Sequence, residues 1–336
     1  MQLVINNPGS YIRKRGECFL LKNEDEELEV SVRKVKQLLI TAHVMLTSDV
    51  VELAIENNID IIFLNYYGKP YGRVWHSKLG SINTIRRKQL FLEDHPYGLL
   101  LVKSWISTKI ENQIKFLNKL AMNRRDERKH LIVDAVIKLK EYKGKIGEIS
   151  NELTVNKVRG SILGYEGSAG RVYFSTLGNL LPKKYQFEKR RKHPALDPFN
   201  CMLNYCYGIL YSNVEKACMI AGLDPYIGIM HCDNYNKKSL VYDLVEMYRA
   251  IMDELVFKLF SQNRVTDDCF DIINDKAYVL NKEGKKLIIE KYHQLLEKSI
   301  RHDKRNIKLG NIIQYDLHKV ANEILRVNID DNLGNI

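Results

Sequence analysis

The chain has 336 residues, and its formal net charge at pH 7 is +11 because 52 lysines and arginines outnumber 41 acidic residues. A chain of this length exceeds the usual size of one hydrophobic core, so we expect two domains. No apolar run approaches the roughly 20 residues that span a bilayer. The first residues also lack the basic and long apolar regions of a signal peptide, so we expect a cytoplasmic protein. The basic balance favours a polyanionic partner, although composition alone does not decide this.

Residues 1–80 are predicted to be rich in strands. Short apolar or alternating runs separated by turn residues occur at Gln2–Ile5, Cys18–Lys22, Leu28–Val32, Gln37–Thr41 and Ile59–Leu64. Thr47–Glu56 predicts a helix, because it opens with capping residues and then places apolar residues on one face. A turn over Tyr66–Gly72 is expected to precede a last strand through Val74 and Trp75.

The pattern becomes helical beyond about residue 83. A long amphipathic helix is marked by Trp105, Ile106, Lys109, Ile110, Gln113, Ile114 and Leu117. Similar patterns predict helices at 131–142, 157–180, 199–221, 239–262, 285–300 and 305–326. We therefore predict a two-domain α+β chain, with an N-terminal β-rich domain at residues 1–82 and a larger helical domain at residues 83–330.

Side chains that commonly bind metals occur in two helical segments and a loop. His231 precedes a helix that begins at Ser239, and this helix carries Asp243 and Glu246 three residues apart and hence on one face. A further acid, Glu166, lies in another helix-like stretch. Imidazole is a strong directional ligand and carboxylates supply charge, so the set suits a catalytic divalent metal. On spacing alone, a solvated acidic helix face and an exposed loop histidine remain the alternative.

Three ordered motifs resemble those of the CRISPR-associated protein one family. The first is Gly-x-Glu-Gly-x-Ala-x-Arg-x-Tyr-Phe at 164–174, and the second is Asp-Pro-Phe-Asn-Cys-Met-Leu-Asn-Tyr-Cys-Tyr at 197–207. The third is His-x(7)-Ser-Leu-x-x-Asp-Leu-x-Glu-x-x-Arg at 231–249. Weaker matches at Pro8–Gly16 and Thr47–Leu53 extend the resemblance over nearly the whole chain.

The resemblance implies a metal-dependent DNA endonuclease and integrase, a hydrolase that inserts new spacers into CRISPR arrays in antiviral defence. In that reaction a spacer 3′-hydroxyl attacks repeat DNA by transesterification. The implied fold is a small N-terminal β-sandwich-like dimerisation domain with a larger all-α catalytic domain. The implied partners are protospacer and repeat DNA, a second copy in a homodimer, and the small second CRISPR-associated protein in a heterohexamer. The alternative is a non-catalytic basic DNA-binding scaffold of the same fold.

By the same resemblance, Glu166, His231 and Glu246 are the expected catalytic ligands of Mn²⁺ or Mg²⁺. Asp243 is the catalytic acid expected to orient a ligand or a water molecule, with binding of a second ion as the alternative. One nitrogen ligand favours manganese over magnesium. Cations near the motifs are candidates for binding DNA phosphates, with a solvated surface as the alternative. These candidates are Arg171, Lys189, Arg190, Arg191, Lys192, Lys237 and Lys238.

Overall fold

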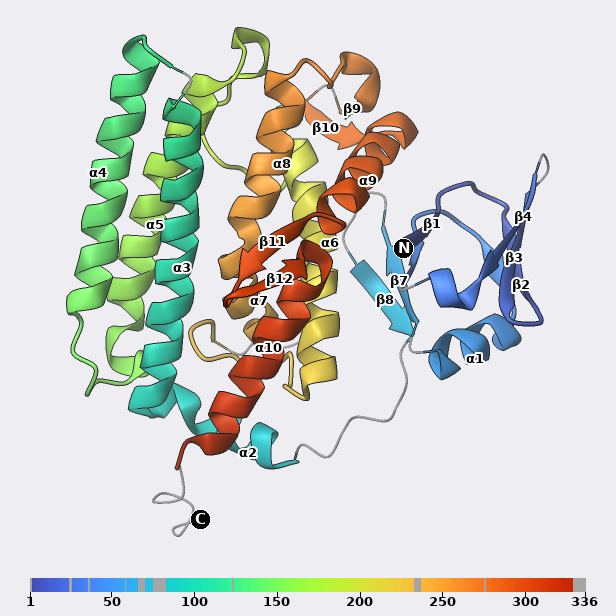
Figure 1. Cartoon of the computed structure of the whole chain (residues 1–336). Coiled ribbons are helices and arrows are strands. Elements are labelled where there is room, and N and C mark those ends of the chain that lie inside the picture. The colour runs from blue at the N-terminus through green and yellow to red at the C-terminus, as the bar shows by residue number, and fades with distance from the viewer. Residues whose placement is uncertain are drawn as a thin grey trace.

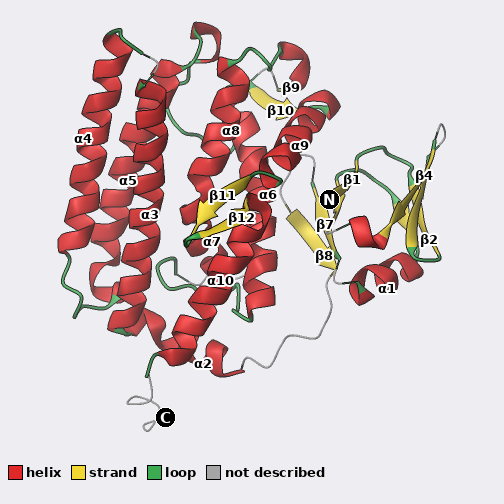
Figure 2. Ribbon diagram, viewed as in Figure 1, coloured by secondary structure: helices red, strands yellow, loops and turns green. Residues whose placement is uncertain are grey.

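The chain folds into a strand-rich N-terminal part and a larger helical part, which lie side by side in Figures 1 and 2. The structure is a computed structural model, and it describes residues 2–23, 26–35, 37–57, 59–65, 70–74, 83–122, 124–232, 237–274 and 276–328. The arrangement confirms the predicted α+β class with two parts of unequal size. The boundary between residues 82 and 83 stays a prediction, because the residues from 75 to 82 lie outside the described ranges.

Two four-stranded sheets build the N-terminal part. Its strands and the helix among them are β1 (Gln2–Ile5), β2 (Tyr11–Arg15), β3 (Cys18–Lys22), β4 (Glu27–Ser31), β5 (Gln37–Ile40), β6 (Met45–Leu46), α1 (Ser48–Glu56), β7 (Asp60–Leu64) and β8 (Pro70–Val74). In the first sheet β1, β5 and β7 are parallel, and β8 runs antiparallel at the edge. The second sheet has the order β4-β3-β2-β6.

Apolar residues occupy both faces of the first sheet, because successive side chains of a strand point to opposite faces. Leu38 of β5 and Ile61 of β7 pack with Phe19 of the second sheet, and all three are fully buried. The alternate residues Leu39 and Ile62 are buried on the other face. The two sheets therefore pack face to face, which is the sandwich-like arrangement that the resemblance implied, and the opposite face of the first sheet is buried as well.

The helical part carries long helices and two short hairpins. The helices are α2 (Asn83–Phe91), α3 (Pro96–Ala121), α4 (Glu127–Glu148), α5 (Val155–Leu180), α6 (Pro198–Ala221), α7 (Ser239–Val245), α8 (Arg249–Ser261), α9 (Lys282–Leu296) and α10 (Leu309–Arg326). The hairpin strands are β9 (Phe270–Ile273), β10 (Ala277–Leu280), β11 (Ser299–His302) and β12 (Arg305–Lys308). No helix in the described ranges is long and apolar enough to cross a membrane.

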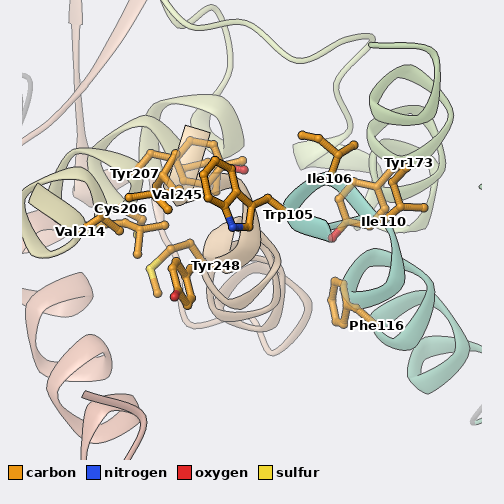
Figure 3. Close-up of a cluster of buried hydrophobic side chains, with 14 of the residues drawn as sticks. Trp105, Ile106, Ile110, Phe116, Tyr173, Cys206, Tyr207, Val214, Val245 and Tyr248 are labelled. Atoms are coloured by element: carbon orange, nitrogen blue, oxygen red, sulfur yellow. The ribbon is translucent and has the colours of Figure 1, made fainter. Parts of the chain in front are cut away.

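One continuous core fixes α3 and α6 against the segment that follows α7. Trp105 of α3 lies with Tyr207 of α6, Val245 and Tyr248 in this core, part of which is drawn in Figure 3. A single 3₁₀ turn, Glu246–Tyr248, joins α7 to α8 and packs on α3. Because these three elements are closely packed, their residues hold fixed positions relative to one another.

Several predicted helix bounds were wrong. The ranges 285–300 and 305–326 run into the two strands of the hairpin β11–β12, whose turn lies between the ranges and has positive φ at Asp303 (44°) and Lys304 (66°). Positive φ at both central residues is the turn geometry of tight hairpins, and it is incompatible with a helix. The range 239–262 begins correctly at Ser239 but is divided by the 3₁₀ turn. The helical part is therefore not all-α in detail.

The strand predictions were closer to the structure. All five predicted runs are strands to within one residue at each end. The strands β2 and β6 were not predicted, because β2 buries only Ile12 among exposed residues and β6 has two residues. The predicted turn over residues 66–72 was wrong at residues 70–72, which belong to β8, while residues 66–69 and the continuation of the last strand to Trp75 lie outside the described residues.

Candidate active site

Two predicted site residues from distant segments meet at one lysine. Glu166 comes from α5, and Glu246 opens the 3₁₀ turn after α7. The ammonium group of Lys109, from the middle of α3, donates to Glu166 Oε1 and lies 2.5 Å from Glu246 Oε2. The side chains of Lys109 and Glu246 are each 8% exposed, and that of Glu166 is 23% exposed. The fold thus brings two carboxylates to a single buried cationic group.

Glu246 is held in its ionised form by the cations around it. Arg249 Nε donates to Glu246 Oε1 at 2.8 Å, and the same guanidinium lies 4.7 Å from the centre of the Tyr207 ring. Burial alone would raise the pKa of Glu246, but the charges of Arg249 and Lys109 outweigh it and lower the pKa to about 2. Glu246 is therefore a carboxylate at neutral pH.

Asp243 fixes the segment that carries His231. Its side chain is completely buried, and its two oxygens accept the backbone N–H groups of Ile229, Met230 and His231 at 2.7, 3.0 and 3.0 Å. The same carboxylate lies 2.6 Å from His231 Nδ1. A carboxylate only accepts, so this network places a hydrogen on Nδ1, and in the neutral ring the lone pair is then on Nε2. Asp243 thus orients His231 in a form able to bind a metal.

The residues suit a divalent cation in donor chemistry. In the described ranges, no three His, Cys, Asp or Glu side chains form a ready-made metal-binding group, and the ammonium of Lys109 lies between the two glutamates instead. Both carboxylates nevertheless face one cationic atom, and within the described ranges the buried Glu246 Oε2 contacts only the ammonium of Lys109. With His231 Nε2 they offer the mixed oxygen and nitrogen set that manganese accepts. The ligand roles of Glu166, His231 and Glu246 stay predictions.

The motif at 197–207 anchors the basic run Lys189–Lys192 to α6. Asp197 caps the helix by accepting the N–H of Asn200 at 2.7 Å, and Asn200 Oδ1 accepts Arg190 Nη1 at 2.8 Å. Asn204 Oδ1 accepts Arg190 Nη2 at 2.7 Å. The Arg190 guanidinium also lies 5.2 Å from the centre of the Tyr207 ring. Arg190 therefore holds this loop on α6 through its hydrogen bonds to Asn200 and Asn204, a role that the sequence did not indicate.

The other candidate phosphate-binding cations differ in their contacts. Lys189 and Lys192 are exposed, and Arg191 is half-buried. Arg171 is exposed and donates to Ser168 Oγ at 2.8 Å. Lys237 lies 5.7 Å from the centre of the Tyr242 ring, and Lys238 pairs with Glu215 at 2.8 Å. Their contacts with DNA stay predictions.

Sequence reasoning assigned no role to three buried charged residues of the site: Lys109, Arg249 and Asp253. The signal for Lys109 was present, because a lysine on the apolar stripe of an amphipathic helix is buried only when it is paired. Asp253, on α8, accepts a hydrogen bond from Tyr207 Oη at 2.6 Å. Burial raises the pKa of Asp253 to about 6, although the hydrogen bond from Tyr207 and the charge of Arg190 oppose the shift.

The raised pKa of Asp253 predicts a pH-dependent contribution to stability. Between about pH 4 and pH 6 the folded protein holds the Asp253 proton while the unfolded chain releases it, so the free energy of unfolding falls as pH rises through this window. Asparagine keeps the acceptor for Tyr207 and does not titrate. We expect Asp253→Asn to gain up to about 3 kcal/mol relative to wild type between pH 4 and pH 7. Urea unfolding at several pH values measures this, and parallel pH profiles would contradict it.

Comparisons with known proteins agree with the motifs. The family model of CRISPR associated protein Cas1 matches residues 3–294. A CRISPR-associated endonuclease Cas1 from Archaeoglobus fulgidus is 30% identical over 328 residues, which cover 93% of this chain and 93% of that relative. A solved CAS1 protein from Thermotoga maritima has a TM-score of 0.81 at 23% identity, covering 97% of each chain. A casposase bound to integration product has a TM-score of 0.79 at 22% identity, covering 96% of this chain and 90% of that one. The family model spans most of the sequence, so this chain belongs to the CRISPR-associated protein Cas1 family.

Proposed function

We propose that this chain is the DNA endonuclease and integrase of CRISPR adaptation, acting with Mn²⁺ or Mg²⁺ at the site of Glu166, His231 and Glu246. The observation that carries the proposal is the meeting of Glu166 and Glu246 at one buried cationic position, beside a histidine whose Nε2 has a free lone pair. Membership of the Cas1 family supports the same reading, and the Archaeoglobus fulgidus relative is itself named an endonuclease.

The residues of this chain have separate roles in the proposed phosphodiester chemistry. A divalent cation at this position supplies charge to neutralise phosphate oxygens and to stabilise the attacking and leaving oxygens. Asp243 keeps His231 in the metal-binding tautomer, and Arg249 keeps Glu246 ionised. In strand transfer the nucleophile is the 3′-hydroxyl of the incoming DNA, so no activated serine or cysteine is required.

The alternative is a basic DNA-binding scaffold that lacks chemistry. A scaffold has no need of a buried carboxylate that is kept ionised against the effect of burial. The discriminating experiment is strand transfer on a supercoiled plasmid that carries a repeat array, with Mn²⁺ or with EDTA. We expect joined products with Mn²⁺ and none with EDTA. DNA binding without joined products under any divalent cation would favour the scaffold.

Within the basic run Lys189–Lys192, we expect some substitutions to affect DNA binding and others to affect stability. We expect replacing exposed Lys189 and Lys192 with alanine to flatten the dependence of log affinity on log salt, by roughly 0.9 units for each lost phosphate contact. We expect Arg190→Ala instead to lower thermal stability, because it removes the hydrogen bonds to Asn200 and Asn204. Salt titrations of duplex binding and thermal melts measure the two effects. An unchanged salt slope in the double lysine variant would remove this run from the DNA path.

The proposed partners are DNA, a second copy of this chain and the small second CRISPR-associated protein, acting in the cytoplasm. Exposed apolar residues support self-association through the N-terminal part, because Tyr11 of β2 and Met45 of β6 are neighbours in the sheet, and 37% and 64% exposed. Sedimentation of the full chain tests the homodimer. We expect Met45→Lys to shift the chain towards monomer, and an unchanged dimer would assign the interface to another surface.

A further inference from the structure

The ammonium of Lys109 lies where the predicted metal ligands converge. Lys109 Nζ donates to Glu166 Oε1 and lies 2.5 Å from Glu246 Oε2, while Arg249 binds the other oxygen, Oε1, of Glu246. The carboxylate oxygens that contact Lys109 are therefore ones that Arg249 does not bind, and they are available to a cation. Lysine is rarely buried this deeply without a carboxylate partner, and here it has two.

The two carboxylates need a cation between them. Two carboxylates that contact the same ammonium lie close enough to repel each other, and a partly buried site screens this repulsion less than water does. Arg249 offsets part of the charge of Glu246, but within the described ranges it forms no ion pair or hydrogen bond with Glu166. Lys109 contacts both glutamates and so supplies the charge that lets α5 and the turn after α7 approach each other.

We propose that Lys109 is a built-in cation that holds Glu166 and Glu246 together in the metal-free protein and withdraws when a divalent ion binds. The inference rests on the proposed function in one respect, that these two glutamates are metal ligands. An ammonium and a divalent ion cannot share the space between the same oxygens, and their like charges repel. The flexible four-carbon stem of lysine lets the ammonium leave without a shift of α3. Lys109 therefore keeps the site assembled and lowers its affinity for metal.

The test is Mn²⁺ binding to the full chain, measured by isothermal titration calorimetry. We expect Lys109→Met to bind Mn²⁺ at least tenfold more tightly than wild type, because the competing cation is gone. The metal-free variant should melt at a lower temperature than wild type and gain more thermal stability from Mn²⁺. Lys109→Gln keeps one hydrogen bond to a carboxylate, and we expect the same direction from it should Lys109→Met fail to fold.

Lys119→Met is the matched control, because Lys119 lies on the same helix and pairs with Glu254 at 2.5 Å. This variant removes the same charge from α3 but at a position away from Glu166 and Glu246, so its Mn²⁺ affinity should equal that of wild type. Mn²⁺ affinity in Lys109→Met and Lys109→Gln that is equal to or weaker than wild type overturns the inference. If Glu166→Ala binds Mn²⁺ as tightly as wild type does, the proposed metal site is itself wrong. This outcome is distinct from the failure of the inference about Lys109.

Discussion

Replacing Glu166, His231 or Glu246 with alanine, one at a time, should abolish both integration and cleavage while duplex binding stays close to wild type. Affinity for DNA phosphates comes from many dispersed cations, so the loss of one ligand changes it little. The chemistry depends on a single ion, whose loss removes the charge that stabilises the reacting oxygens. Strand transfer with Mn²⁺ and fluorescence anisotropy of a labelled duplex measure the two effects on the same protein samples.

The structure calls for one further variant and one control in this series. Glu246→Ala leaves the buried cations Arg249 and Lys109 without their partner, so lost activity would be confounded with lost stability. Glu246→Gln keeps the shape and an acceptor for Arg249 while removing the charge. Glu254→Ala is the control, because Glu254 pairs with Lys119 and Lys258 rather than with Lys109, and its activity should be normal. Robust strand transfer by any ligand variant would remove that residue from the site.

The motifs predicted candidate site residues, but they did not predict how those residues are held. Glu166, Asp243 and Glu246 could be identified because each lies in a run whose residue order resembles that of a family. The partners that control them lie elsewhere in the sequence: Lys109 is 57 residues before Glu166. Such a pairing depends on the packing of α3 against α5, and helical periodicity gives the buried face of a helix without naming its neighbour.

The fold shows the same limit in its hairpins. Alternation of apolar and polar residues is weak in Ser299–His302 and Arg305–Lys308, where only Ile300 and Ile307 are strongly apolar. A short run of this kind fits helical and strand periods equally, so the decisive information is the turn at Asp303 and Lys304. The helices α5 and α6 were predicted to within two residues at each end, since a period repeated over several turns leaves little ambiguity, whereas the range 131–142 covered only the middle of α4.

Asp243→Asn should reduce Mn²⁺ affinity and strand transfer by about 10–100-fold, the usual range for residues that orient a metal ligand. Asp243 Oδ2 accepts the N–H groups of Ile229 and Met230, while Oδ1 accepts from His231. Asparagine has one acceptor oxygen. If that oxygen serves Ile229 and Met230, the amide N–H₂ faces His231 Nδ1 and donates to it. The imidazole hydrogen then moves to Nε2, which removes the lone pair offered to the metal.

Two measurements separate this tautomer effect from a simple loss of stability. Nitrogen chemical shifts of His231 report which ring nitrogen carries the hydrogen, and we expect Nδ1 in wild type and Nε2 in Asp243→Asn. Asp316→Asn is the matched control, because Asp316 pairs with His302 Nε2 at 2.5 Å in a second histidine–aspartate contact. The asparagine oxygen still accepts the hydrogen bond from Tyr248, but the carboxylate contact with His302 is lost. Stability should therefore fall, while Mn²⁺ affinity should equal that of wild type. Wild-type Mn²⁺ affinity in Asp243→Asn would show that the orientation of His231 does not depend on this carboxylate.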